Sequence, residues 1–414
     1  MRKPRWFSFV ALLFVLSLVA AACADDEPSS TDSGGDSPTA ACDEDEFGCV
    51  EVAAGDAIQL GTLLVIVGEN SALGLDSQYG VQIAVDMYGD IEGHSVELVN
   101  EDEGCTPEGG TTGARSLVSN ESIAAVIGTS CSSAGEPAAQ ITSDAGVVLI
   151  SPSNTAPSLT DPATHQPFYL RTAHNDKIQG AAMAQFVGED LGLKTAATIH
   201  DGSPYAEQLQ QVFADTFTSE GGEITGQEAI LVGDTDMKPA LTSVAAAKPE
   251  FLYFPVFVAE GGALAAQGRE TAGLEDTKFG GADGMLTPDW VEAAGADNAE
   301  GTYLSGPDLA FGGGFYEDEF LPAYEEAYGD PTAVFHAHAF DATTMVLNAI
   351  KEAAIVDGDS LFIPRTALRD AMFATSDYAG ITGTLTCDEN GDCNPGATIS
   401  VSQVVDGAFE RIWP

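Results

Sequence analysis

Two clusters of polar side chains stand out as groups that could bind a small anion. Ser132 and Ser133 follow the apolar run 123–127 and open a stretch of helical period. Ser133 and Glu136 have the spacing of a helix-capping box. Free N–H groups at such a helix start, together with serine hydroxyls, suit a carboxylate. The same residue types are also common as plain helix caps, so both interpretations stay open here.

The second cluster is Ser153, Asn154 and Thr155, which follows the next apolar run, 146–150. Open α/β sheets bind their ligands at the carboxyl ends of neighbouring strands. We therefore expect the two clusters to face one site and to offer it neutral hydrogen-bond donors and acceptors.

Patterns typical of catalysis or of metal binding are not found around these clusters. The six histidines are scattered, and none lies in a metalloprotease helix motif. Ser130 and Ser203 have glycine neighbours but lack the full Gly-x-Ser-x-Gly elbow. The loop 68–71 fits neither a phosphate-binding loop nor a dinucleotide fingerprint. We expect no enzyme activity, no cofactor and no metal.

The elements that must position these groups alternate along the chain. Short β-rich apolar runs cover 60–67, 96–99, 123–127, 146–150, 195–199, 229–232, 251–255, 278–281 and 302–305. Stretches of helical period lie between them, including 79–87, 111–118, 178–191, 206–219 and 237–247. Such alternation predicts parallel sheets covered by helices on both faces, and it is too long for one modest sheet. The expected fold is α/β, with two doubly wound parallel-sheet lobes.

Composition and charge exclude some classes of partner. The 414 residues include 15 Lys+Arg against 64 Asp+Glu, which gives a formal net charge of −49. A surface this acidic repels phosphate backbones, so we expect no nucleic-acid binding. With 44% hydrophobic residues the chain is globular, and its length suffices for two or three domains.

The amino-terminal residues are predicted to be a targeting segment. A basic start and an apolar run end in small residues just before Cys23, so residues 1–22 are expected to be a signal peptide. Small residues before a cysteine resemble a bacterial lipobox, although Ala20 stands where leucine is usual. Lipidation of Cys23 would anchor the chain to the outer face of the cytoplasmic membrane, with 23–56 as a flexible acidic tether. Ordinary secretion with a stray thiol is the alternative.

The remaining six cysteines suggest three disulfides, since an even number in an exported chain is typical of them. Sequence neighbours favour Cys42–Cys49 and Cys387–Cys393, which leaves Cys105 with Cys131. No pair has the Cys-x-x-Cys spacing that a zinc site favours. Six cysteines allow many other connectivities, so this pairing is a preference.

Five segments together carry a resemblance to a known family. They are 126–138 (VIGTSCSSAGEPA), 150–157 (ISPSNTAP), 170–172 (LRT), 199–205 (IHDGSPY) and 385–392 (LTCDENGD). In this order and spacing they resemble the type I periplasmic binding proteins that deliver ligands to ABC importers, the branched-chain amino-acid-binding family. The resemblance covers roughly 58–414, and the Cys105–Cys131 pairing is similar to that family's.

For the fold, the resemblance implies two lobes joined by a multi-strand hinge. Lobe 1 is expected to contain 57–174 plus 306–378, and lobe 2 is expected to contain 175–305 plus 379–414.

For the site, the resemblance implies a ligand held between the lobes. Ser132 and Thr155 would meet its carboxylate, Tyr205 would close over it, and Asp283 would receive its ammonium. Ser133, Ser153 and Asn154 complete the predicted set, and two further positions depart from the family's usual aromatic residues, Phe257 (often tyrosine) and Leu73. These departures reshape the side-chain pocket, so the sequence does not name leucine as the ligand.

For function, the resemblance implies an extracytoplasmic lipoprotein that captures an amino acid, or a related small amide or carboxylate. A monomer would deliver it to ABC permease subunits. Two alternatives stay open: a sensory module of the same fold that signals to a membrane partner, and a surface adhesion lipoprotein with an unused cleft.

Overall fold

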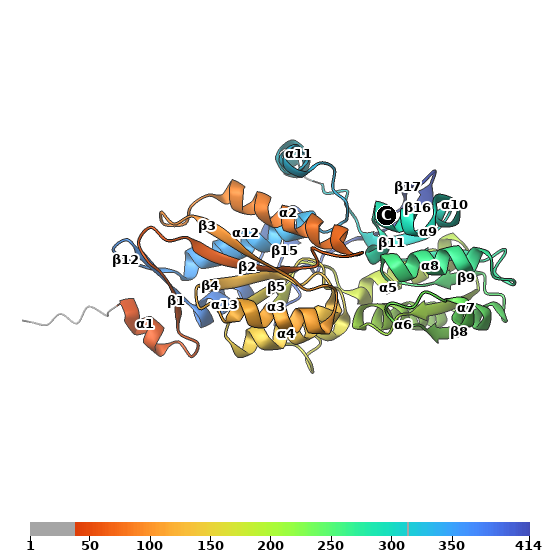
Figure 1. The fold of residues 1–414 in the computed structure, drawn as a ribbon, viewed down its shortest axis with the longest axis horizontal. Helices are drawn as coiled ribbons and strands as arrows, with labels where there is room; N and C mark the ends of the chain where they lie inside the picture. Colours follow the sequence, from red (N-terminus) through yellow and green to blue (C-terminus); the bar gives the residue numbers. More distant parts are fainter. Residues whose placement is uncertain (1–37, 313) are drawn as a thin grey trace, which may run out of the picture. The chain divides into compact units, whose positions relative to one another are not determined.

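The structure is a computed structural model that describes residues 38–312 and 314–414. The predicted signal peptide, Cys23 and the first part of the predicted tether lie outside the described residues. Within them, two separate and mostly parallel sheets confirm the predicted two-lobed α/β fold (Figure 1). Both lobes belong to one compact unit of the chain. Among the helices that the structure describes, none is both long and apolar enough to cross a membrane.

Lobe 1 is built on a five-stranded parallel sheet in the order β3-β2-β4-β5-β6. Its strands are β2 (Ile58–Leu64), β3 (Val96–Asp102), β4 (Ile123–Gly128), β5 (Val148–Ser151) and β6 (Tyr169–Arg171). The helices are α2 (Ser71–Tyr88), α3 (Pro107–Val118), α4 (Ser132–Asp144), α12 (His336–Ala353) and α13 (Arg365–Phe373). β4 is buried along its whole length, as expected for a parallel strand covered on both faces.

Helix pairs cover the two faces of this sheet: α2 with α12, and α3 with α4 (Figure 1). Glycines permit both close approaches. A side chain at Gly80 of α2 would collide with the backbone carbonyl of His336, and one at Gly110 of α3 would collide with Ala134. The second pair matters for the site because α4 begins at Ser132.

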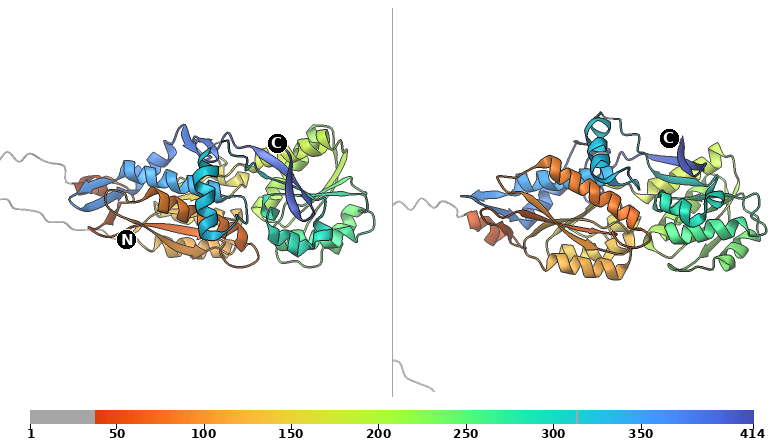
Figure 2. Two further views of the ribbon diagram at one scale, coloured as in Figure 1. Left: turned by 90° about the horizontal axis from the view of Figure 1, so that it is seen from above. Right: turned by 45° about the horizontal axis from the view of Figure 1, so that its top comes forward.

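Lobe 2 has a seven-stranded sheet in the order β17-β16-β11-β10-β9-β7-β8. Its strands are β7 (Thr195–His200), β8 (Glu223–Ala229), β9 (Phe251–Tyr253), β10 (Lys278–Gly281), β11 (Tyr303–Pro307), β16 (Ile399–Val405) and β17 (Ala408–Trp413). The last two strands of the chain add antiparallel to β11, and Figure 2 shows them beside this lobe. The helices are α5 (Asp176–Gln185), η2 (Phe186–Asp190), α6 (Pro204–Ser219), α7 (Lys238–Ala245), α8 (Val258–Arg269), η3 (Asp283–Met285), α9 (Pro288–Ala294) and α10 (Ala296–Ala299).

Smaller elements complete lobe 1. They are α1 (Pro38–Glu44), β1 (Cys49–Val52), η1 (Pro157–Thr160), η4 (Tyr316–Phe320), α11 (Leu321–Tyr328), β12 (Ile355–Asp357), β13 (Ser360–Pro364), β14 (Tyr378–Gly380) and β15 (Gly383–Leu385). The three disulfides preferred from the sequence, Cys42–Cys49, Cys105–Cys131 and Cys387–Cys393, are present.

The predicted tether and lobe boundaries need correction. β1 pairs antiparallel with β13 and buries Val50 and Val52, so the chain joins lobe 1 before residue 57. The alternation of these valines with Glu51 is the period of a half-buried strand. At the other boundary, Leu385 and Cys393 pack in the core of lobe 1, so the chain returns to lobe 2 after Cys393.

Candidate functional site

The site lies where the carboxyl ends of the parallel strands of both sheets meet. A cavity of about 460 Å³ is lined by loops that follow β2, β3 and β4 in lobe 1 and β7 and β9 in lobe 2. Among its lining residues are Cys105 and Ser133 from lobe 1 and Ser203 and Phe257 from lobe 2. This is the position at which open α/β sheets bind ligands.

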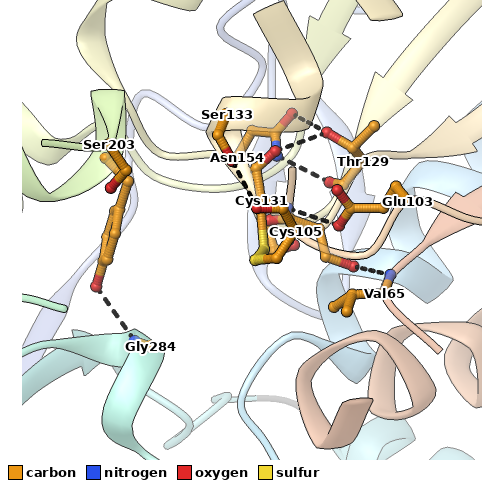
Figure 3. Close-up of a disulfide and its surroundings, with 12 residues drawn as sticks. Val65, Glu103, Cys105, Thr129, Cys131, Ser133, Asn154, Ser203 and Gly284 are labelled. Carbon is orange, nitrogen blue, oxygen red and sulfur yellow. Dashed lines mark hydrogen bonds between the residues drawn. A yellow bond between two sulfur atoms is a disulfide. The ribbon is translucent and has the colours of Figure 1, made fainter. Parts of the chain in front are cut away.

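The wall contributed by α4 presents neutral donors. Cys131 is the N-cap of α4, and the disulfide to Cys105 ties this helix start to the loop after β3 (Figure 3). Ser133 Oγ donates to the carbonyl oxygen of Cys105 (3.0 Å), and Ser132 Oγ accepts from the N–H of Ala156 (3.3 Å). Helix geometry leaves the first N–H groups of α4 without acceptors inside the helix. This end of α4 is therefore electropositive and suited to an anion.

A buried acid supports this wall from behind. Glu103 Oε1 accepts from the N–H of Cys131 (3.1 Å), and its other oxygen has no partner among the residues described (Figure 3). Burial raises the pKa of Glu103 to about 8, against the backbone hydrogen bond from Cys131. Burial thus favours the neutral form of this carboxyl, which leaves the positive end of α4 available to another anion.

In the loop of Ser153, Asn154 and Thr155, the threonine hydroxyl has no partner among the described residues, whereas the asparagine amide is hydrogen-bonded. Thr155 is buried, and its Oγ1 has no hydrogen-bond partner in the described part of the chain. Asn154 Nδ2 donates to the carbonyl oxygen of Thr129 (2.9 Å), and its Oδ1 accepts from Thr129 and Tyr169 (3.0 and 3.2 Å). Ser153 Oγ donates to the carbonyl oxygen of Ser130 (3.0 Å). Asn154 and Ser153 therefore hold the loop, and Thr155 keeps a free group.

An ion pair between the fully buried Arg171 and the partly exposed Asp392 fixes the same loop. The Arg171 guanidinium pairs with Asp392 and also donates to the carbonyl oxygens of Asn154 and Ala156 (3.2 and 2.9 Å). Burial raises the pKa of Asp392, but the Arg171 charge and hydrogen bonds outweigh it and hold that pKa below its ordinary value. Both charges are thus partnered inside the protein.

On the wall of lobe 2, Asp283 is held by neutral donors. Its Oδ1 accepts from Gln179 Nε2 (2.7 Å) and from the Tyr205 hydroxyl (3.0 Å), and Tyr205 accepts in turn from the N–H of Gly284 (3.2 Å). Burial raises the pKa of Asp283 from 3.8 to about 6, although both hydrogen bonds lower it. The predicted pair Tyr205 and Asp283 is thus in contact.

A second buried acid, which we did not predict, lies beside it. Asp176 opens α5, is fully buried, and has no hydrogen-bond partner for either carboxylate oxygen within the described ranges. Burial first, and the nearby Asp283 second, raise its pKa well above the ordinary value. Burial lowers the pKa of the neighbouring His174 to about 4, so this imidazole is neutral. Neither acid has an ion-pair partner among the described residues.

This cluster could hold a cation of either of two kinds. Ligand atoms of His174, Asp176 and Asp283 lie within 4.8 Å of one another, which is compatible with a metal ion. However, Asp283 Oδ1 already accepts two hydrogen bonds, and His174 Nε2 contacts Gln179 Oε1. An ammonium group, which needs acceptors and no fixed coordination geometry, matches the remaining carboxylate oxygens better.

The two apolar positions of the predicted site lie close to this cluster. Phe257 packs against Tyr205, with ring centroids 5.1 Å apart, and it lines both the main cavity and a small one of about 10 Å³ beside Asp283. Leu73 lines the small cavity and packs against Cys131 and Phe335. Both side chains thus touch the space between the lobes.

Comparison with known proteins agrees with this geometry. Residues 57–408 match the family model described as periplasmic binding protein. The chain belongs to this family. The resemblance found in the sequence to type I periplasmic binding proteins for branched-chain amino acids is therefore confirmed.

Individual relatives of this periplasmic binding protein extend over most of its length. A leucine-, isoleucine-, valine-, threonine- and alanine-binding protein from Pseudomonas aeruginosa is 30% identical over 342 residues, which are 82% of this chain and 88% of the relative. The structure of a leucine-binding protein from Thermotoga maritima is 26% identical, with a TM-score of 0.77 over 86% of this chain and 98% of that one. A branched-chain amino acid transporter substrate-binding protein from Streptococcus pneumoniae, solved with isoleucine, is 27% identical, with a TM-score of 0.75 over 86% of this chain and 100% of that one.

The residues that we missed in this periplasmic binding protein had weak sequence signals. Asp176 occupies the first turn of α5, where acids are common because of the helix dipole. Glu103 follows a strand among other acids. What distinguishes both is burial, which depends on elements distant in the sequence: η3 lies near Asp176, and the start of α4 lies above Glu103.

Proposed function

We propose that this periplasmic binding protein captures an α-amino acid between its lobes and delivers it to an ABC importer. One observation carries the proposal: two buried acids, Asp176 and Asp283, lie together without a cationic partner among the described residues. Buried carboxylates are stabilised by a counter-charge, so a cation from outside the chain would complete this pair. The relatives' names, which describe amino-acid-binding and transporter proteins, support an α-ammonium as that cation.

In the proposed complex the ligand carboxylate meets the start of α4 and the neighbouring Thr155, whose carbonyl oxygen accepts from the N–H of Asp176 (3.0 Å). The start of α4 with Ser132, and the free hydroxyl of Thr155, supply uncharged donors to it. A zwitterion then finds an acidic wall for one end and an electropositive wall for the other. Because both walls come from one chain, we propose that a monomer is sufficient.

Ligand binding would stabilise a closed arrangement of the lobes. Tyr205 and Asp283 belong to lobe 2, whereas Ser132 and Thr155 belong to lobe 1. A ligand that contacts both sets makes its full interactions only when the lobes are together, and it shifts the population accordingly. The closed form is the one that we propose the importer recognises.

We further propose that the mature protein is a lipoprotein on the outer face of the cytoplasmic membrane, anchored through Cys23. The support is the basic and apolar start followed by small residues before this cysteine. Cys23→Ser should release the protein from membranes, because acyl chains are the strong membrane affinity available to so acidic a chain. Persistence of the variant in the membrane fraction after a high-salt wash would contradict the anchor.

The binding proposal is tested by calorimetry with amino acids selected in a thermal-shift screen. Asp283→Ala should weaken binding by about 2–5 kcal/mol, as truncation of one side of a buried charge pair does. Asp341→Asn is the matched control, because Asp341 is equally buried, its pKa is also raised by burial to about 6, and its oxygens accept from Ile381 and Thr382. This control should keep wild-type affinity. Equal affinity in Asp283→Ala, or loss of binding with EDTA, would contradict the proposal.

A further inference from the structure

The main cavity is strongly acidic on its outer side. Glu69, Glu108, Asp201 and Glu260 all line it, and no lysine, arginine or histidine is among the described residues that do so. Glu69 and Glu108 are exposed at the rim, whereas Asp201 and Glu260 are buried. An aliphatic ligand side chain would place apolar surface against these groups and gain nothing from their charge.

Within this cavity, Asp201 is the group that lacks a partner. Its side chain is only 3% exposed; Oδ1 accepts from the N–H of Ser203 (2.9 Å), and Oδ2 is buried without a hydrogen-bond partner in the part of the chain described. Asn70 Oδ1, on the opposite lobe, is a second buried acceptor without such a partner. Burial raises the pKa of Asp201, as expected for a buried acid without a counter-charge. Glu260 Oε1, by contrast, already accepts from the N–H of Gly233 (2.7 Å).

Phe257 and Asn70 line both the cavity that contains Asp201 and the small cavity beside Asp283, and so connect the two places. A ligand that reaches both places would therefore run an apolar segment along the Phe257 ring and carry a donor at each end. An aliphatic chain with a terminal cation has this pattern.

We propose that the cavity binds an α-amino acid with a cationic side chain, such as lysine or ornithine, whose distal ammonium meets Asp201 and Asn70. This inference rests on the proposed function for the α-amino and carboxylate groups and adds the specificity for the side chain. It departs from the ligands named for the relatives, which include leucine, isoleucine and valine.

The test compares two ligands that differ only in the distal ammonium. Calorimetry should show that lysine binds at least about tenfold more tightly than norleucine, a difference of about 1.4 kcal/mol. Asp201→Asn keeps the Oδ1 acceptor for Ser203 and removes the charge, so it should abolish this preference. Asp215→Asn, which removes an exposed acid on α6, should retain the preference and controls for net charge.

The outcomes separate the two proposals. If norleucine binds as tightly as lysine, or if the preference survives in Asp201→Asn, the side-chain inference is overturned while the proposed amino-acid binding stands. If neither these ligands nor any other amino acid binds, both are overturned. A circular-dichroism spectrum and a cooperative thermal transition like those of the wild type show that Asp201→Asn is folded.

Discussion

Two clusters of charged side chains, one at Arg171 and the other at Asp176, have opposite organisation. Arg171 and Asp392 form a complete ion pair, and the remaining donors of the guanidinium bind the loop that carries Thr155. Asp176 and Asp283 are both buried, more so than Asp392, yet none of the described residues supplies a cation to these two acids. A charge cluster completed within the chain stabilises the fold, whereas an incomplete one costs stability until a ligand supplies the missing charge. The comparison teaches that burial alone does not mark a candidate binding site, and that the absence of a counter-charge for two adjacent buried acids is the more informative observation.

The largest effect is expected at the complete pair. Arg171→Met leaves Asp392 without its cation and should destabilise the protein by about 3–5 kcal/mol in urea unfolding. The double variant Arg171→Met with Asp392→Leu should recover much of this loss, because it removes the stranded charge as well. If the single variant were as stable as wild type, the pair would not be the structural support that the geometry indicates.

The incomplete cluster should respond in the opposite direction. Asp176→Asn relieves the repulsion between two buried acids, so the ligand-free protein should become more stable, while amino-acid affinity falls by about 2 kcal/mol or more. Urea unfolding and calorimetry on the same preparation measure the two effects. A variant that loses stability and keeps its affinity would place Asp176 with the structural cluster instead.

A smaller effect is expected on the carboxylate wall. Ser132→Ala should weaken binding by about 1–3 kcal/mol, the range for one hydrogen bond to a charged group. Ser143→Ala, near the other end of α4, is the matched control: its Oγ accepts from the N–H of Phe168, away from the site. This control should lower the melting temperature without changing affinity, and equal affinities for the two variants would argue against Ser132 as a ligand group.

The smallest expected effect is a change in stability with pH that is caused by Asp283. Because the pKa of Asp283 is raised from 3.8 to about 6, the folded state binds this proton more tightly than the unfolded state. Its contribution is therefore fully present below pH 3.8 and is lost as the pH rises through about 6. Asp283→Asn should lack this decline, so the stability difference between variant and wild type should change over that window. A constant difference from pH 4 to pH 7 would contradict the raised pKa.

The sequence predicted more of the fold than of the site. The alternation of strand and helix patterns predicted the two α/β lobes, and the serines after the run 123–127 predicted the start of α4. The sequence could not predict which way side chains point within a loop. Asn154 and Thr155 are adjacent polar residues, but Asn154 is hydrogen-bonded to Thr129 and Tyr169, whereas the Thr155 hydroxyl has no partner among the described residues. That difference depends on packing against β4 and β6, which no local pattern records.

Composition also failed to predict where the tether, expected over residues 23–56, ends. An acidic, glycine- and serine-rich start suggested a flexible segment through residue 56. The short alternation of Val50 and Val52 was too brief to read as a strand until its partner β13 was known. Short strands far from their partners in sequence are thus the elements that sequence patterns miss most readily.

The central claim is that an α-ammonium completes the Asp176–Asp283 cluster, and calorimetry with desamino analogues tests it most directly. Leucine is compared with 4-methylpentanoate, and lysine with 6-aminohexanoate, since each analogue lacks only the α-amino group. We predict that the amino acid of whichever pair binds loses about 2 kcal/mol or more without this group, and that the loss disappears in Asp283→Asn. Equal affinity of an amino acid and its desamino analogue for the wild-type protein would contradict the account.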